Sequence, residues 1–162
     1  MPKKNDQIQE IYQAALQKLD NKELKELATG MQGTVYLYQS DKENKKYIVK
    51  EFNTDRFGKN AFYQEQRALE SLKENRGSGL NQFTNTNVIL MDYYDGRSLL
   101  QGETSDETEE HDTKTPSPQT PKQWTKAAKL HFALEMTQQL EEIHKKKVLH
   151  MDLKPENILK HN

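Results

Sequence analysis

The chain has 162 residues, with 24 basic and 25 acidic side chains, no cysteine and a low mean hydropathy of −1.08. The balanced charge gives no electrostatic reason to expect a nucleic acid or a membrane surface as a partner. The absence of cysteine excludes disulfides and thiolate metal sites in this sequence. It also agrees with a reducing cytoplasm, which is the location that we expect. No apolar run approaches the roughly 18 residues that a membrane-spanning helix needs.

The first expected element is an amphipathic helix over residues 6–20. Asp6 can cap its first turn. We expect its apolar face to pack on the domain that follows, and the alternative is that this face binds a partner protein. The apolar residues recur at spacings of three and four, at Ile8, Ile11, Ala15 and Leu19.

Two strands joined by glycines follow within residues 24–38. Gly30 and Gly33 lie between one strand pattern and the β-rich run Val35-Tyr36-Leu37-Tyr38. Glycines in such a turn let backbone N–H groups approach a phosphate chain, although most turns of this kind only join two strands. No Gly-Lys-Ser/Thr triplet follows, so the turn is not a Walker A loop.

A lysine and a glutamate in the next two elements form a candidate pair. Residues 47–52 alternate as a strand that contains Lys50, and residues 60–73 have the pattern of a helix. Glu65 lies on the same helix face as Phe62, and a carboxylate on an apolar face is costly unless it is paired. We expect Lys50 to be its partner, the alternative being a lysine that points to solvent.

The middle of the chain alternates between polar and apolar stretches. Residues 74–87 are polar, and we expect only a short strand over 80–83 there. Residues 87–99 begin with a buried-strand pattern and run into a glycine turn. Residues 101–123 hold six acidic residues and then three Ser/Thr-Pro steps, with almost nothing apolar, so we expect a disordered insertion. The Ser/Thr-Pro steps are candidate targets of proline-directed kinases, the alternative being a plain solvated linker.

The longest expected helix spans residues 125–147 and leads into the stretch richest in chemistry. Residues 148–159 read V-L-H-M-D-L-K-P-E-N-I-L. Pro155 biases the residue before it towards an extended backbone, so we expect a loop. We expect short buried strands at Val148-Leu149 and Ile158-Leu159, on either side of that loop.

Three side chains of this loop suit phosphoryl transfer. Asp152 can accept a proton from an attacking hydroxyl, and Lys154 can neutralise charge on a phosphate. Asn157 can offer an amide oxygen to Mg²⁺, which prefers oxygen ligands. A charged surface loop with no such role is the alternative.

The loop resembles the catalytic loop of eukaryotic-type serine/threonine protein kinases, whose pattern is H-R-D-L-x-x-x-N, with Met151 in place of the arginine. The glycine turn is similar to the G-x-G-x-x-G-x-V motif of that family, except that Ala28 replaces the first glycine. Residues 47–50 loosely match V-A-I-K, and Lys50 with Glu65 is similar to the family's Lys–Glu pair.

The resemblance implies an α+β fold. It consists of a kinase-like small lobe, with an antiparallel five-stranded sheet and one helix, followed by the first helix and catalytic loop of an incomplete large lobe. The implied division is an N-terminal helical extension over 1–21, a small lobe with hinge over 22–99, the insertion over 100–124 and the start of a large lobe over 125–162.

The resemblance also implies ATP and Mg²⁺ as ligands, and a protein as substrate or regulatory partner. It makes Asp152 and Lys154 catalytic residues and Asn157 a metal ligand. It assigns adenine contacts to the backbones of Asp92 and Tyr94. The full implied ATP-binding set is Leu27, Ala28, Gly30, Gly33, Val35, Ile48, Lys50, Glu65, Met91, Asp92, Tyr94 and Ser98.

No Asp-Phe-Gly motif follows the loop within these 162 residues, although its aspartate carries the main Mg²⁺ load in the family. We therefore expect phosphoryl transfer by this chain to be weak or absent. Three hypotheses follow: a truncated form of an active kinase, a non-catalytic pseudokinase-like module, and a small-molecule phosphotransferase. The third ranks last because phosphotransferases of the antibiotic-kinase type usually carry a histidine where Lys154 lies.

Overall fold

The computed structural model describes residues 4–98, 125–150 and 153–160. The chain divides into two compact units, residues 1–93 and residues 94–162, and each is described by itself. The insertion expected over residues 100–124 lies outside the described residues.

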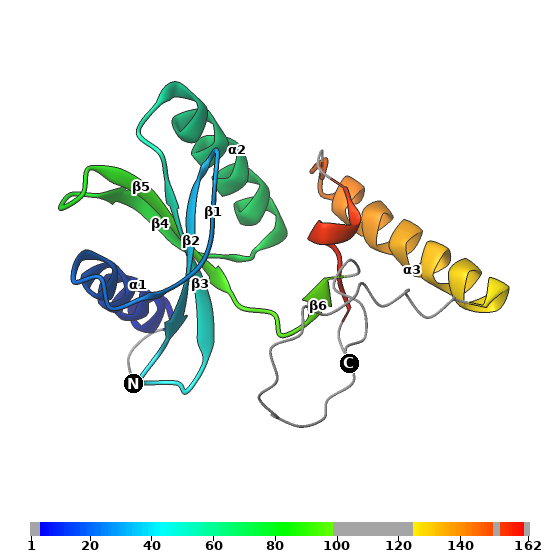
Figure 1. Cartoon of the computed structure of the whole chain (residues 1–162), viewed down its shortest axis with the longest axis horizontal. Coiled ribbons are helices and arrows are strands. Elements are labelled where there is room, and N and C mark those ends of the chain that lie inside the picture. Colours follow the sequence, from blue (N-terminus) through cyan, green and yellow to red (C-terminus); the bar gives the residue numbers. More distant parts are fainter. Residues whose placement is uncertain (1–3, 99–124, 151–152, 161–162) are drawn as a thin grey trace, which may run out of the picture. The chain divides into compact units, whose positions relative to one another are not determined.

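The first unit is built on a five-stranded antiparallel sheet with the strand order β1-β2-β3-β5-β4 (Figure 1). Hairpins join β1 to β2 through residues 31–32, β2 to β3 through residues 40–45 and β4 to β5 through residues 82–85, where polar turn residues separate the strand patterns. The predicted five-stranded sheet is therefore confirmed. Its strands are β1 (Lys25–Gly30), β2 (Gly33–Gln39), β3 (Lys46–Phe52), β4 (Asn75–Asn81) and β5 (Thr86–Asp92).

Helix α1 (Lys4–Asp20) covers one face of this sheet (Figure 1). Its side chains Ile11, Tyr12, Ala15 and Leu19 are buried in one cluster with residues of β2, β3 and β5. Burial of each large aliphatic side chain contributes about 1.5–3 kcal/mol. The expectation that this helix packs on the following domain is confirmed.

Helix α2 (Arg56–Leu72) covers the opposite face. Its Phe62 packs edge-on against Phe52 of β3 and contacts the cluster that contains Ile89. The helix begins four residues before the predicted start at residue 60, because Asp55 accepts a hydrogen bond from the Gly58 backbone at 2.7 Å and caps it. Gly58 precedes the predicted helix, whereas in the structure it lies in the first turn of α2.

Strand β4 was predicted wrongly: it spans Asn75–Asn81 and not residues 80–83. Two glycines of this polar stretch, Gly77 and Gly79, leave room for helix α1. A Cβ atom on Gly77 would lie 2.6 Å from Cδ2 of Tyr12, and one on Gly79 would lie 3.7 Å from the Tyr12 hydroxyl. Burial raises the pKa of Tyr12 to about 12. The tyrosine side chain thus fills the space that two missing side chains leave on β4.

The described part of the second unit contains helix α3 (Lys126–Lys145), a 3₁₀ turn at Pro155–Asn157 and two short strands that pair with each other. Strands β6 (Arg97–Ser98) and β7 (Leu159–Lys160) form this antiparallel pair. The strand expected at Val148-Leu149 is wrong, since that segment has no strand and Leu149 is 68% exposed. A neighbouring β-strand is therefore absent on the N-terminal side of the loop among the described residues.

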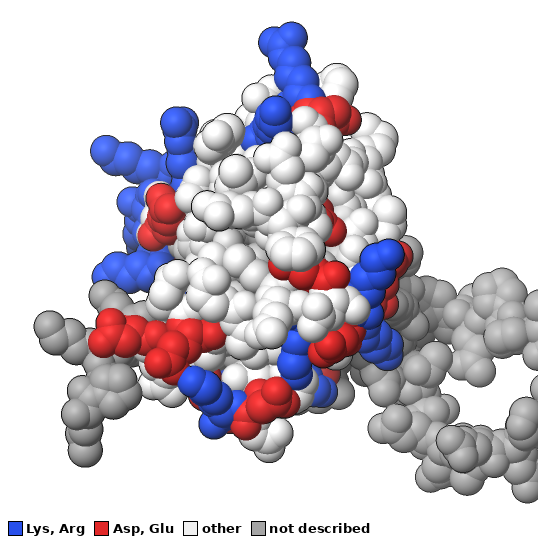
Figure 2. Space-filling model, turned by 90° about the vertical axis from the view of Figure 1, so that its left-hand side faces the viewer, with Lys and Arg blue, Asp and Glu red and all other residues white. Residues whose placement is uncertain are grey.

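Charged side chains of both signs are interspersed on the face of the molecule that Figure 2 shows, around an uncharged centre. This mixture agrees with the balanced composition of the chain. Within the described ranges, none of the helices combines the length and apolar character that crossing a membrane requires.

Candidate functional site

Lys50 and Glu65 meet in the first unit. Strand β3 supplies the lysine and helix α2 the glutamate, and the Nζ–Oε2 distance is 2.5 Å. Their side chains are only 17% and 28% exposed. The predicted pair is confirmed, and each partner neutralises a charge that partial burial would otherwise make costly.

Lys50 has two further neighbours on the same side of the sheet. Its ammonium group lies 4.8 Å from the centre of the Phe52 ring, and it donates to Oε1 of Gln32 at 3.4 Å. Gln32 belongs to the glycine turn between β1 and β2. The lysine is therefore held between the glycine turn and helix α2. An anionic group that contacts its ammonium group would lie next to both elements.

Strand register places most of the predicted binding residues on the face that α2 covers. Residues directly opposite each other in neighbouring strands project to the same face. One cross-strand row runs Ala28, Val35, Lys50, Ile89, and the next runs Leu37, Ile48, Met91. The rows therefore place the Lys50 cation among small and branched apolar side chains, which suits a flat apolar ring joined to phosphates; Lys25 of β1 continues the second row beyond Leu37.

The two glycines of the turn are explained differently. Gly33 has φ +156°, and a Cβ atom there would lie 2.0 Å from the Glu51 carbonyl oxygen, so the hairpin itself requires glycine. A Cβ atom on Gly30 would meet nothing within 4 Å. Packing of the described residues therefore does not explain glycine at position 30. Close approach of a ligand to the backbone would explain it.

The tip of this turn is fixed to the segment after β3. The Asn53 amide group donates to the Met31 carbonyl at 2.8 Å, and the Asn53 backbone N–H donates to the Gln32 carbonyl at 2.9 Å. Leu27 lies at an irregularity in the pairing of β1 with β2 and is 44% exposed. It is thus the one β1 or β2 residue of the predicted set that the register leaves without a direct cross-strand partner.

The end of β5 carries a carboxylate that sequence reasoning treated only through its backbone. Asp92 accepts hydrogen bonds from Arg76 at 2.6 Å and Lys45 at 2.8 Å, and its side chain is 11% exposed. Burial acts to raise the pKa of Asp92, but the bonds from Arg76 and Lys45 outweigh burial and hold the pKa below its usual value. The predicted adenine contact Tyr94 belongs to the second unit and is 58% exposed.

The loop over residues 148–159 that resembles a kinase catalytic loop is described only in part. Asp152 lies outside the described residues, as does Met151. Lys154 has the extended backbone that Pro155 predicts, with φ −150° and ψ 159°, but residues 155–157 then form a 3₁₀ turn rather than an open loop. Ser98 lies in β6, and nothing is described of its side chain.

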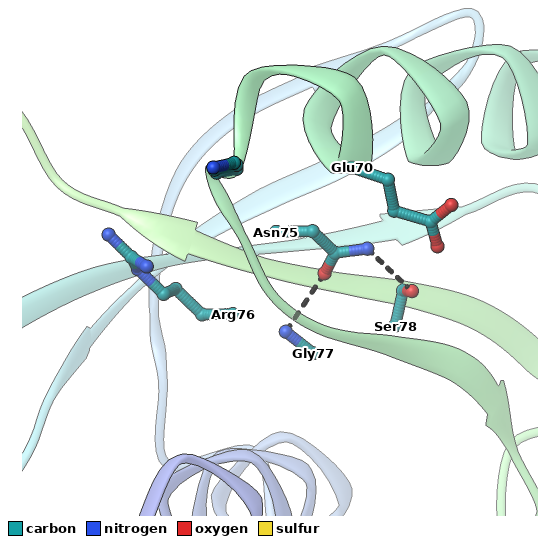
Figure 3. A pocket seen from close by; sticks show the side chains of 6 residues that line it. Glu70, Asn75, Arg76, Gly77 and Ser78 are labelled. Carbon is teal, nitrogen blue, oxygen red and sulfur yellow. Dashed lines mark hydrogen bonds between the residues drawn. The ribbon is translucent and has the colours of Figure 1, made fainter. Parts of the chain in front are cut away.

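Sequence reasoning missed Gln32, Lys45 and Arg76. Arg76 lay in a stretch interpreted as a polar loop, so nothing indicated that it would face a carboxylate in another strand. It also lines an open depression of about 400 Å³ between the end of α2 and the start of β4 (Figure 3). That depression is lined by none of the predicted site residues; its lining is Glu70, Lys73, Asn75, Arg76, Gly77 and Ser78.

Comparison with known proteins identifies this arrangement. The family model described as "Protein kinase domain" matches residues 21–162. Two crystal structures of the PknI kinase domain from Mycobacterium tuberculosis resemble the chain with TM-scores of 0.57 each, at 20% and 21% sequence identity. They cover 84% and 83% of this chain, which spans 53% and 51% of theirs, about half of their length. No curated protein matches the chain.

Proposed function

The chain belongs to the protein kinase domain family, and on that premise we propose that it binds ATP and forms part of a kinase that transfers the terminal phosphoryl group to Ser or Thr hydroxyls of a protein, with transfer by these 162 residues alone weak or absent. The contact between Lys50 and Glu65 carries this proposal. A carboxylate that fixes a lysine beside a glycine turn leaves the ammonium group ready to bind the α- and β-phosphates. An isolated surface lysine would offer the same charge without a fixed position.

The rest of the ATP molecule has matching groups on the same sheet face. Val35 and Ile48 supply apolar surface for the adenine ring, and Met91 lies beside Ile48 at the end of that surface. We propose that the glycine turn covers the phosphates. We also propose adenine hydrogen bonds from the backbones of Asp92 and Tyr94, and a ribose contact from Ser98.

The transfer step uses the residues of the catalytic loop. We propose that Asp152 accepts the proton of the substrate hydroxyl as its oxygen bonds to the γ-phosphorus. The bond from that phosphorus to the bridging oxygen breaks, and ADP leaves. Lys154 balances the charge on the transferring group, and Asp152 holds the proton until it passes it to solvent after ADP has left.

Magnesium is the second ligand that the family implies. Asn157 would supply one neutral amide oxygen, which suits Mg²⁺ chemically. Among the described residues, no group of three or more His, Cys, Asp or Glu side chains is placed to hold a metal ion. Mg²⁺ at phosphoryl-transfer sites is held by one or two protein ligands together with the substrate phosphates, so this result does not test the proposed role of Asn157, and no step above depends on the metal.

A non-catalytic role, in which the chain binds nucleotide and regulates a protein partner, is the second candidate. Ala28 in place of the first glycine of the turn favours it, since the methyl group limits backbone approach to phosphates. The proposed division of the chain into an extension, a small lobe, an insertion and the start of a large lobe is the same for both candidates.

Incubation of the full chain with γ-labelled ATP, Mg²⁺ and a protein rich in Ser and Thr separates these candidates. Transfer that Asp152→Asn abolishes, with ATP binding retained, supports the catalytic role. ATP binding without transfer supports the regulatory role. Absence of both binding and transfer would show that the proposed function is wrong.

A further inference from the structure

The carboxylate of Asp92 is bound from two sides at the end of strand β5. Arg76 Nη2 lies 2.6 Å from Oδ2 and Lys45 Nζ lies 2.8 Å from Oδ1, so each oxygen has its own cation. Asp92 is 11% exposed, whereas Lys45 is 46% exposed. The anion is thus nearly withdrawn from solvent at the strand end, while at least one of its cations still reaches water.

The two cations come from the two neighbours of β5 in the sheet. Arg76 belongs to β4, and Lys45 directly precedes β3. The β4–β5 register shifts between Asn75 and Gly77, which makes Arg76 the extra residue of a bulge. A bulge redirects the side chain that it contains, and this one directs Arg76 towards Asp92.

The bulge has its own support. The Asn75 side chain accepts from the Gly77 backbone N–H at 2.9 Å and donates to the Ser78 hydroxyl at 2.9 Å. Figure 3 shows Asn75 between these two partners, with the Arg76 side chain extending away from Glu70 and Ser78. Lys45 Nζ lies 5.2 Å from the centre of the Tyr47 ring. The bulge and the ring contact therefore restrict where the two cations lie beside the carboxylate.

Asp92 is also where the sheet ends and the chain leaves the first unit. Asp92 pairs with Tyr47, and the next residue, Tyr93, donates from its backbone to the Lys46 carbonyl at 3.3 Å. A backbone hydrogen bond of this length constrains the end of the strand only weakly. The two charged bonds to Asp92, which are shorter, fix the backbone at the position from which the chain continues.

We propose that Arg76 and Lys45 are positioning residues that hold the Asp92 backbone in the geometry needed to hydrogen-bond the edge of the adenine ring. This inference rests on the proposed function and adds residues that no motif of the sequence includes. Neither cation touches the nucleotide. By ordering the end of β5 in the unbound protein, they reduce the conformational entropy that is lost when the base binds.

The test compares Arg76→Gln with the conservative Arg76→Lys and with Arg67→Gln, which removes an exposed arginine from α2. The full chain is titrated with adenosine and with ATP. We expect Arg76→Gln to weaken both ligands by the same factor, about 3- to 10-fold, because the effect is on the base end alone. Arg76→Lys and Arg67→Gln should bind within about twofold of the wild type, since one keeps the ion pair and the other never contributed to it.

A second measurement needs no nucleotide. Amide hydrogen exchange of Tyr93 in the free protein should be several-fold faster in Arg76→Gln than in Arg67→Gln, because the strand end loses a bond. Unchanged exchange, or unchanged adenosine affinity in a wild type that does bind, would overturn the positioning role alone. A wild type that binds neither ligand would overturn the proposed function and the positioning role together.

Discussion

Lys50 Nζ and Glu65 Oε2 lie 2.5 Å apart although 15 positions separate the two residues in the chain. The contact joins strand β3 to helix α2 across the face of the sheet that carries Val35, Ile48 and Met91. It therefore fixes two things at once, the position of a cation and the distance of the helix from the sheet.

Substitution of Glu65 by glutamine should weaken both effects. We expect Glu65→Gln to lower ATP affinity by about 3- to 10-fold, since a neutral amide holds the ammonium group less firmly. The free energy of unfolding should fall by about 1–3 kcal/mol, because the largely buried ammonium group loses its charged partner. Calorimetric titration and urea unfolding measure the two quantities. Glu70→Gln, an exposed change on the same helix, is the control, and an equal loss of affinity there would refute a specific role for Glu65.

The contact of helix α1 with strand β4 makes a prediction about stability. Gly77→Ala should lower the free energy of unfolding by about 1–3 kcal/mol, because the new methyl group would overlap the Tyr12 ring. Gly79→Ala should change it by no more than about 0.5 kcal/mol, since its methyl group would make only ordinary contact with the Tyr12 hydroxyl. Urea denaturation of the two variants checks this order, and equal effects would mean that α1 does not pack as described.

The two glycines of the turn should separate stability from binding. Gly33→Ala should cost at least about 2 kcal/mol of folding free energy, because it places a methyl group against the Glu51 carbonyl. Gly30→Ala should leave stability nearly unchanged and weaken ATP binding, because the position is open in the free chain. Thermal unfolding and ATP titration of both variants test this. Full ATP affinity in a well-folded Gly30→Ala protein would show that the glycine turn is not part of the ATP-binding site.

Much of this arrangement followed from residue patterns, and the failures have physical causes. The Lys50–Glu65 contact was predictable because a carboxylate on an apolar helix face needs a partner. Strand β4 was not predictable, because its glycines Gly77 and Gly79 are explained only by the packing of Tyr12. That tyrosine lies 65 and 67 positions earlier in the chain. The role of Arg76 could not be predicted either, since it depends on a bulge that appears only when β4 pairs with β5.

Stability should depend on Asp92 at low pH. The pKa of Asp92 is lower in the folded chain than the ordinary value of 3.8, so the folded state favours the charged form. This contribution is complete above the unfolded-state pKa of about 4 and is lost as pH falls through the lower folded-state pKa. Asp92→Asn should therefore flatten the fall of unfolding free energy below about pH 4. Denaturant unfolding of both proteins between about pH 6 and 3 measures this, and parallel curves would contradict the ion cluster.

The central claim is that Lys50 binds the phosphates of ATP from the face of the sheet that it shares with Glu65. Calorimetric titration of the full chain with ATP and Mg²⁺ tests it most directly, with Lys50→Met compared with Lys59→Met, which removes an exposed lysine from helix α2. We expect Lys50→Met to lose at least about tenfold in affinity and Lys59→Met to remain within about twofold of the wild type. Equal affinity of Lys50→Met and the wild type, in a protein that binds ATP, would contradict the account.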